Sequence, residues 1–313
     1  MTSPADVLPP PPAPADLVAR SSPPTLPQGL PWNFDQSVPD GEGDRDVKAT
    51  SRGVTVQEFR WEEEEMLMSD MNALAEKDNF VVVYPRGLEG AQIWTPFPAP
   101  GPTYSFNAGG CCPSACSKGA DDVGFTKFLL SYLPSELDLT FDRSRIYATG
   151  MSNGGFMTNR VGCELSDTLA AIAPVSGPLM NSPSIAWKSD PFDCETTRPV
   201  PVLHIHGLKD IIVPFNGDRL LSFPKIEDSV EGWASRNGVP AEEKWAVSYQ
   251  NGDVTCESVG TKATNVTLCK VGGGGHSWPG APGKLCPESG PFACTRDLVA
   301  SEAIWDFFKD KTL

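Results

Sequence analysis

Short apolar runs alternate with amphipathic segments along most of this chain, from residue 61 to the C-terminus. Continuous apolar runs such as Phe80–Tyr84 and Ala171–Val175 predict strands that are buried on both faces. Between these runs, apolar residues recur at helical spacing, as in the segment 62–77. This alternation predicts an α/β fold, with a mostly parallel sheet and helices on both of its faces.

The predicted elements share clear boundaries at glycine, proline and polar clusters. Helices are predicted at residues 62–77, 121–132, 153–165, 230–237 and 298–308. Strands are predicted at residues 80–84, 145–149, 171–175, 200–205, 244–249 and 264–271, with a further short strand considered at 54–59. Long loops are predicted at residues 86–120 and 178–198. No internal repeat interrupts this order.

The first 60 residues have a different character. Eleven of the first 40 are proline, which fixes φ and removes a backbone donor. We therefore expect residues 1–60 to form an extended or disordered leader, and residues 61–313 to form the folded domain. Residues 1–20 also lack the basic start and apolar core of a signal peptide.

Composition and charge exclude several classes of protein. The chain has 313 residues, 40% hydrophobic and 21% charged, as in ordinary globular domains. Its net charge of −15 would repel nucleic-acid phosphates and anionic lipid, so we expect neither as a partner. No apolar run is long enough to span a bilayer. We expect a monomer that needs no metal or organic cofactor.

Nine cysteines raise the question of redox compartment. None forms a Cys-x-x-Cys pair, and the spacing Cys111-Cys112-x-x-x-Cys116 does not suit a zinc ribbon. Several lie in loop-like stretches, which favours disulfides and an exported, extracellular protein. The alternative is a set of small buried apolar residues in a reducing compartment. Asn265-Val266-Thr267 is a glycosylation sequon, a pattern that also arises by chance.

A serine stands between a predicted strand and a predicted helix, in the segment Gly150-Met151-Ser152-Asn153-Gly154. This Gly-x-Ser-x-Gly spacing is typical of a nucleophile elbow, in which a sharp, strained turn exposes the serine. The N–H of Asn153 would then point to the place where an oxyanion forms. The alternative is a tight glycine turn with an incidental serine. We interpret Ser152 as the nucleophile.

The chain offers three histidines as a base for this serine. His204 and His206 lie at the end of a predicted strand, where we expect them to pack or to support other residues. His276 lies in a glycine-rich loop directly after a strand, from which a base can reach a serine on another strand. A surface histidine in a flexible loop is the alternative. We interpret His276 as the base.

The acid that orients the base should lie between Ser152 and His276 in the sequence. Asp210 follows the strand that ends at His206-Gly207, which places it at the carboxyl edge of the sheet. Asp190, Asp193 and Asp218 are rivals by order alone. Asp210 therefore completes the predicted Ser152, Asp210 and His276 triad.

Several segments together resemble a known family, the α/β-hydrolase esterases grouped with poly(3-hydroxybutyrate) depolymerases and with feruloyl or acetylxylan esterases of carbohydrate esterase family 1. The resemblance covers residues 66–310. The matching segments are Phe80–Pro85, Asn107–Cys112, Asp121–Phe125, Tyr147–Gly155, His206-Gly207-x-x-Asp210 with Val213-Pro214, Gly273–Gly280 and Ser301–Phe308. The resemblance implies the α/β-hydrolase fold, with Ser152 as nucleophile, Asp210 as acid and His276 as base.

The chain departs from the family at its front. Members of the family carry a strand and a glycine-rich His-Gly loop before the helix that corresponds to residues 62–77, and that loop supplies the second oxyanion donor. Residues 1–60 contain no His-Gly, so the N-terminal strands are predicted to be missing or replaced. Loss of one oxyanion donor typically lowers turnover by roughly 10²–10³. Phe106 also stands where the family often has tryptophan.

These features predict a serine carboxylic ester hydrolase that forms an acyl-enzyme. The expected substrate is a feruloylated or acetylated cell-wall polysaccharide, and the alternative is a polyhydroxyalkanoate polyester. Trp278, next to the predicted base, either forms a wall for the acyl group or simply packs. A different class of function also remains open, namely a non-catalytic hydrolase-like module that binds polymer or a partner through its proline-rich tail.

Overall fold

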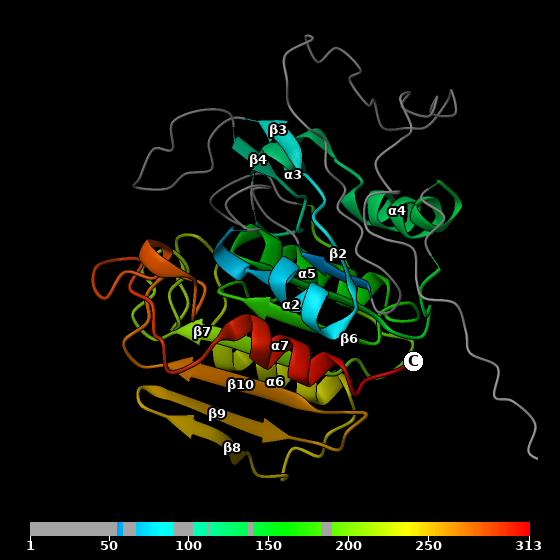
Figure 1. Cartoon of the computed structure of the whole chain (residues 1–313). Coiled ribbons are helices and arrows are strands. Elements are labelled where there is room, and N and C mark those ends of the chain that lie inside the picture. Colours follow the sequence, from blue (N-terminus) through cyan, green and yellow to red (C-terminus); the bar gives the residue numbers. More distant parts are fainter. Residues whose placement is uncertain (1–54, 59–66, 91–102, 112, 137–139, 183–189) are drawn as a thin grey trace, which may run out of the picture. The chain divides into compact units, whose positions relative to one another are not determined.

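The computed structural model describes residues 55–58, 67–90, 103–111, 113–136, 140–182 and 190–313. Their centre is one eight-stranded sheet (Figure 1). The strands follow the order β2 (Val81–Val83), β1 (Thr55–Glu58), β5 (Ile146–Met151), β6 (Ala171–Val175), β7 (Val202–Gly207), β10 (Val266–Val271), β9 (Val254–Val259) and β8 (Ala246–Asn251). The pairs from β2 to β10 are parallel, whereas β9 and β8 pair antiparallel. The predicted mostly parallel sheet is confirmed.

Helices cover both faces of this sheet. They are α2 (Met71–Asp78), α4 (Asp122–Glu136), α5 (Asn153–Glu164), α6 (Ile226–Arg236) and α7 (Ala300–Phe308). One apolar core joins α4, α5 and α6 to the sheet, and a second joins α2 and α7 to its other face. Neighbouring residues of β5 contribute to different cores, Ile146 to the first and Tyr147 to the second, because side chains alternate along a strand. This two-sided burial confirms the α/β-hydrolase arrangement of layers.

Aromatic stacking joins α7 to the sheet. Tyr147 of β5 stacks on Phe308 with ring centroids 4.6 Å apart, and Phe80 stacks on Trp305 at 4.1 Å. The Tyr147 hydroxyl also donates to the carbonyl of Lys311 at 2.7 Å. The closing amphipathic helix predicted at residues 298–308 therefore covers one face of β5, the strand that leads to Ser152.

The predicted long loop at residues 86–120 contains regular structure that the sequence did not reveal. Strands β3 (Leu88–Gly90) and β4 (Thr103–Ser105) pair antiparallel in a separate small sheet, and α3 (Pro113–Lys118) follows them. Strand β9 was also missed, because its buried residues alternate with half-buried ones and lack a continuous apolar run. These elements are short or mixed in polarity, which weakens any periodic signal.

The sheet includes a strand from the span that sequence analysis assigned to the leader. Strand β1 lies between β2 and β5, parallel to both, next to the strand that leads to Ser152. The domain therefore includes residues before Trp61. The proline-rich segment and residues 59–66 after β1, on which the expectation about the second oxyanion donor falls, lie outside the described residues.

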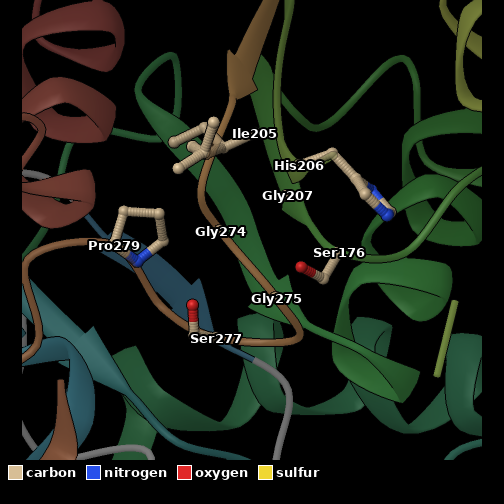
Figure 2. A pocket seen from close by; sticks show the side chains of 9 residues that line it. Ser176, Ile205, His206, Gly207, Gly274, Gly275, Ser277 and Pro279 are labelled. Carbon is tan, nitrogen blue, oxygen red and sulfur yellow. The ribbon is translucent and has the colours of Figure 1, made fainter. Parts of the chain in front are cut away.

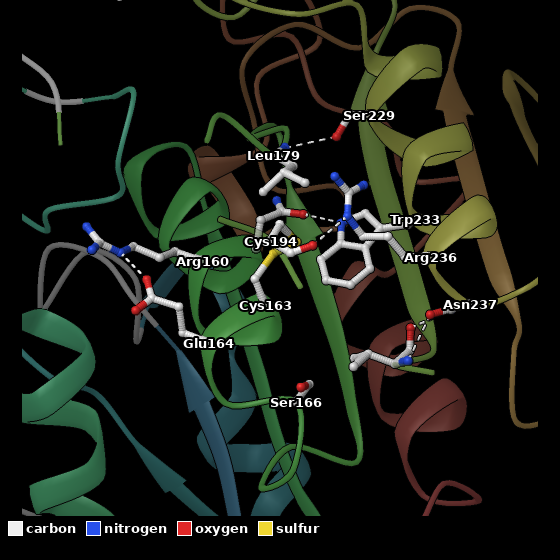
Figure 3. Close-up of a disulfide and its surroundings, with 12 residues drawn as sticks. Arg160, Cys163, Glu164, Ser166, Leu179, Cys194, Ser229, Trp233, Arg236 and Asn237 are labelled. Atoms are coloured by element: carbon white, nitrogen blue, oxygen red, sulfur yellow. Dashed lines mark hydrogen bonds and ion pairs between the residues drawn. A yellow bond between two sulfur atoms is a disulfide. The ribbon is translucent and has the colours of Figure 1, made fainter. Parts of the chain in front are cut away.

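Three disulfides join described cysteines: Cys163–Cys194, Cys256–Cys269 and Cys286–Cys294. Figure 3 shows the first, which joins the end of α5 to the segment before β7, with Trp233 and Arg236 of α6 beside it. Arg236 Nε donates to the Cys194 carbonyl at 3.1 Å. The expectation of disulfides is confirmed. Among the described helices, none is long and apolar enough to cross a membrane.

Candidate active site

Ser152 occupies a sharp turn between β5 and α5. Its φ of 55° and ψ of −121° lie in a region that non-glycine residues rarely adopt, at a cost of about 1–3 kcal/mol. The Ser152 N–H donates to the carbonyl of Val175 at 2.9 Å, which ties the turn to β6. This geometry is that of a nucleophile elbow.

Two glycines allow this turn to form. A Cβ on Gly177 would lie 2.5 Å from the Ser152 carbonyl oxygen, and a Cβ on Gly155 would lie 2.7 Å from the Val175 carbonyl oxygen. Real Cβ contacts are not this short, so any side chain at these positions would push the helix away from the strand. The elbow is therefore held by backbone packed directly on backbone.

Asn153 begins α5, so its backbone N–H is among the helix donors that have no partner within the helix. Its side chain is used elsewhere: Oδ1 accepts from the Phe106 N–H at 2.8 Å, and Nδ2 donates to the Phe106 carbonyl at 3.1 Å. These two bonds fix the first turn of α5 against the loop after β4. The arrangement leaves a helix N-terminus next to Ser152, where negative charge is stabilised.

Asp210 and His276 form a buried pair. His276 Nδ1 lies 2.7 Å from Asp210 Oδ2, and the two side chains are 3% and 0% exposed. The other carboxylate oxygen of Asp210 accepts from the N–H groups of Ile212 and Val213 at 2.9 and 2.8 Å. A carboxylate held in this way keeps a proton on Nδ1, which leaves Nε2 of the neutral ring free to accept one.

The surroundings of Asp210 keep it ionised. Burial raises the pKa of this carboxyl, but the charge of His276 and its hydrogen bond lower it. The hydrogen bond from the Val213 N–H lowers it further, so the pKa lies below the ordinary value. Asp210 can therefore orient the imidazole and stabilise its charged form.

The other two histidines support the acid. His206 Nε2 lies 2.8 Å from the carbonyl of Val213, which makes it the donor there, and 3.5 Å from Asp210 Oδ2. His204 Nε2 lies 3.1 Å from His206 Nδ1. Burial lowers the pKa of His206 to about 4, and that of His204 also falls well below its usual value. Both rings are thus neutral at physiological pH and brace the loop that carries Asp210.

The rival acids do not pair with His276 among the described contacts. Asp190 accepts from Asn107 Nδ2 at 2.8 Å and pairs with Arg160. Asp218 accepts from two successive backbone N–H groups of its own loop, and Asp193 is exposed. Asp210 is the acid that meets His276.

Trp278 is not an exposed wall of the site. It is 1% exposed, and its indole N–H donates to Ser301 Oγ at 3.0 Å on the side of α7. Of the two roles considered for this residue, the structure therefore supports packing. The sequence could not decide this, because a tryptophan suits a core and a binding wall equally well.

The three predicted triad residues lie at one edge of the sheet. Ser152 follows β5, Asp210 follows β7, and His276 follows β10. These strands are parallel, so their carboxyl ends meet at the edge where sites form in open α/β sheets. A small pocket lies where the end of β7 packs on the loop that carries His276 (Figure 2); it is lined by Ser176, Ile205, His206, Gly207, Val271, Gly274, Gly275, Ser277 and Pro279.

Sequence reasoning missed the contacts that fix residues 272–280, the segment that carries His276 and that we call the base loop. Hydrogen bonds to carbonyls of the segment 291–293 come from Gly275, His276 and Ser277. The two segments are too far apart in the sequence for helix or strand periodicity to predict this contact. The cysteines at positions 286 and 294, which flank this segment, were the available signal. Their pairing becomes visible only in the folded chain.

Comparison with known proteins gives a consistent result. Residues 126–223 match a family model described as Phospholipase/Carboxylesterase. The chain is 33% identical over 209 residues to feruloyl esterase B of Piromyces equi, covering 64% of this chain and 34% of that protein. It is 25% identical over 209 residues to a bifunctional acetylxylan esterase/xylanase of Neocallimastix patriciarum, covering 65% and 25%. The chain thus spans about a third and a quarter of these relatives' lengths.

Two further likenesses extend over more of the chain. A putative esterase of Nocardia uniformis subsp. tsuyamanensis is 27% identical over 263 residues, covering 76% of this chain and 68% of that protein. The structure of an acetyl xylan esterase from Aspergillus awamori superposes with a TM-score of 0.55 at 15% identity, covering 84% and 91%. This last likeness shows a shared fold.

Proposed function

Because the chain is an α/β-hydrolase similar in sequence to feruloyl and acetylxylan esterases, we propose that it is a serine carboxylic ester hydrolase acting through Ser152, Asp210 and His276. The observation that carries the proposal is the buried Asp210–His276 pair at 2.7 Å, at the same sheet edge as the strained turn of Ser152. A serine and a base oriented by an acid form the general constellation for acyl transfer.

The reaction proceeds in two halves. His276 Nε2 takes the proton of the Ser152 hydroxyl while Oγ bonds to the ester carbonyl carbon, and the carbonyl electrons move to its oxygen. The Asn153 N–H stabilises this oxyanion, and ionised Asp210 stabilises the imidazolium. The intermediate collapses as the bond to the alcohol oxygen breaks and His276 returns the proton to it. Water then releases the acid from Ser152 by the same steps, with His276 again as base.

The proposed substrate is a feruloyl or acetyl ester on a cell-wall polysaccharide. The names of the relatives support this class, and the disulfides support an extracellular enzyme. A polyhydroxyalkanoate polyester is the alternative substrate. Release of ferulate from methyl ferulate and of acetate from acetylated xylan, measured beside release of 3-hydroxybutyrate from polymer, distinguishes the two.

The proposal is tested by hydrolysis of a short p-nitrophenyl ester by the full chain and by Ser152→Ala. We expect the substitution to remove turnover and labelling by a fluorophosphonate, while the near-UV circular dichroism stays unchanged. Full activity in Ser152→Ala would refute the assignment. A folded parent that neither hydrolyses esters nor reacts with the fluorophosphonate would instead indicate the non-catalytic module.

A further inference from the structure

A disulfide closes a short loop beside the predicted base. Cys286 and Cys294, eight positions apart, bound the segment 286–294, which we call the clasp loop. This segment contains no helix or strand and lies between a short 3₁₀ turn (Gly283–Leu285) and α7. Its shape is set by the disulfide and by two inner bonds, from the Cys294 N–H to Pro287 and from the Ala293 N–H to Gly290.

The clasp loop receives hydrogen bonds from three consecutive residues of the base loop. The His276 N–H donates to the Pro291 carbonyl at 2.8 Å, and the Gly275 N–H donates to the Ala293 carbonyl at 2.7 Å. The Ser277 hydroxyl donates to the same Ala293 carbonyl at 2.8 Å. The backbone on both sides of the imidazole is thus fixed by carbonyls of the clasp loop.

The two loops touch backbone to backbone. A Cβ on Gly275 would lie 2.2 Å from the Pro291 carbonyl oxygen and 3.1 Å from the Ala293 nitrogen. On its other side the base loop packs on the end of β7, where the Lys209 N–H donates to the Gly274 carbonyl at 2.9 Å. The base loop is therefore held between two walls, and the clasp loop is the wall that has no regular structure of its own.

A glycine-rich base loop cannot hold its position unaided. Four glycines precede His276, and glycine has the largest conformational freedom to lose. The reach of Nε2 depends on this backbone, and a shift of about 1 Å at a reacting group can lower turnover roughly 10²-fold. Opening the disulfide would release the clasp loop, since the closed ring restricts the conformations available to it.

We propose that the clasp loop is a positioning element for His276, and that turnover depends on the intact Cys286–Cys294 disulfide. This inference rests on the proposed function. Reduction by a dithiol would break the S–S bond, pass two electrons and two protons to Cys286 and Cys294 as thiols, and oxidise the reductant to its cyclic disulfide. The base would then keep its Asp210 partner but lose its fixed backbone.

The decisive comparison is between two double variants, Cys286→Ala/Cys294→Ala and Cys163→Ala/Cys194→Ala. The second removes the disulfide at the far end of α5, which closes a longer loop of 31 positions and should therefore affect stability at least as much. We expect both variants to lower Tm. Only the clasp variant should lower kcat, by about 10- to 100-fold with little change in KM.

A second readout needs no substrate. The Nδ1 proton of His276, held by Asp210, should give a strongly downfield proton resonance, which a His276→Gln spectrum assigns. We expect this resonance to shift or broaden in the clasp variant and to persist in the control variant. If the parent hydrolyses no ester, the proposed function fails while this resonance still tests the clasp loop.

The proposal is overturned if the folded clasp variant matches the control variant in both kcat and the His276 resonance. Should the clasp variant fail to fold, Gly275→Ala decides, because it disturbs the contact while leaving the disulfide intact. Its control is Gly232→Ala in α6, where a Cβ would meet only the far end of the flexible Arg236 side chain. We expect loss of kcat and of the resonance in Gly275→Ala alone, and retention of both would equally overturn the proposal.

Discussion

At the scale of single residues, the acid of the predicted triad gives the sharpest test. Asp210→Asn replaces a carboxylate that accepts from His276 and from two backbone N–H groups by an amide that can favour the wrong imidazole tautomer. We expect kcat to fall by about 10⁴, as such substitutions do in serine hydrolases. Turnover of a p-nitrophenyl ester measures this. Asp218→Asn is the control, and an equal loss there would contradict the choice of Asp210.

Asp122 predicts a pH dependence of stability. It is buried, and burial raises its pKa to about 6, although the Asn107 N–H and Arg160 act in the opposite direction. Between its unfolded value near 4 and this folded value, the folded chain holds a proton that the unfolded chain has lost. The resulting stability is present below pH 4 and is lost as the pH rises through 6.

Asp122→Asn removes this titration. The free energy of unfolding of the variant relative to the parent should therefore rise between pH 4 and pH 6, by about 3 kcal/mol at most. Urea unfolding at several pH values measures this difference. A difference that stays constant across this range would show that Asp122 does not titrate there.

At the scale of elements, the contact between α5 and β6 carries the elbow. Gly177→Ala would place a Cβ 2.5 Å from the Ser152 carbonyl oxygen, so the helix must move away from the strand. We expect the free energy of unfolding to fall by about 1–3 kcal/mol. We also expect kcat of the folded variant to fall, because Ser152 moves with the helix. Chemical denaturation and ester turnover measure the two effects. Gly232→Ala in α6, where the added Cβ meets only the far end of the flexible Arg236 side chain, should retain kcat; if kcat falls equally there, the steric argument is wrong.

The elements also show where local patterns suffice. Strands β5, β6, β7 and β10 are buried along nearly their whole length and read directly as apolar runs. Strand β8 is exposed throughout, yet a strand was predicted at residues 244–249. Its observed bounds, Ala246–Asn251, lie two residues later at each end. Strand β9 and the small sheet of β3 and β4 lack a distinct period, so their pairing with neighbours is what defines them.

At the scale of the whole molecule, the disulfides make different contributions to stability. In the loop-closure model the Cys163–Cys194 bridge, 31 positions apart, contributes about 3–4 kcal/mol. The Cys286–Cys294 bridge, eight positions apart, contributes about 2–3 kcal/mol. Denaturation of the two double alanine variants should reproduce this order. The reverse order would mean that strain or residual structure in the unfolded chain outweighs loop length.

The sequence by itself determined the features that reside in contiguous residues. The Gly-x-Ser-x-Gly turn, the alternation of strands and helices, and a histidine in a glycine-rich loop follow from local backbone preferences and periodicity. They were enough to predict the fold class and to name Ser152 and His276, whose catalytic roles stay proposals.

Only the tertiary structure decided which distant residues meet. It places Asp210, which the sequence had favoured by its position after a strand, 2.7 Å from His276, buries Trp278 in the core, and packs the clasp loop against the loop that carries His276. Such contacts depend on strand order, on the packing of whole elements and on cysteine pairing. They join residues that are far apart in the sequence, and the chain between two such residues must close into a loop before they meet. No single stretch of sequence carries a signal for such contacts.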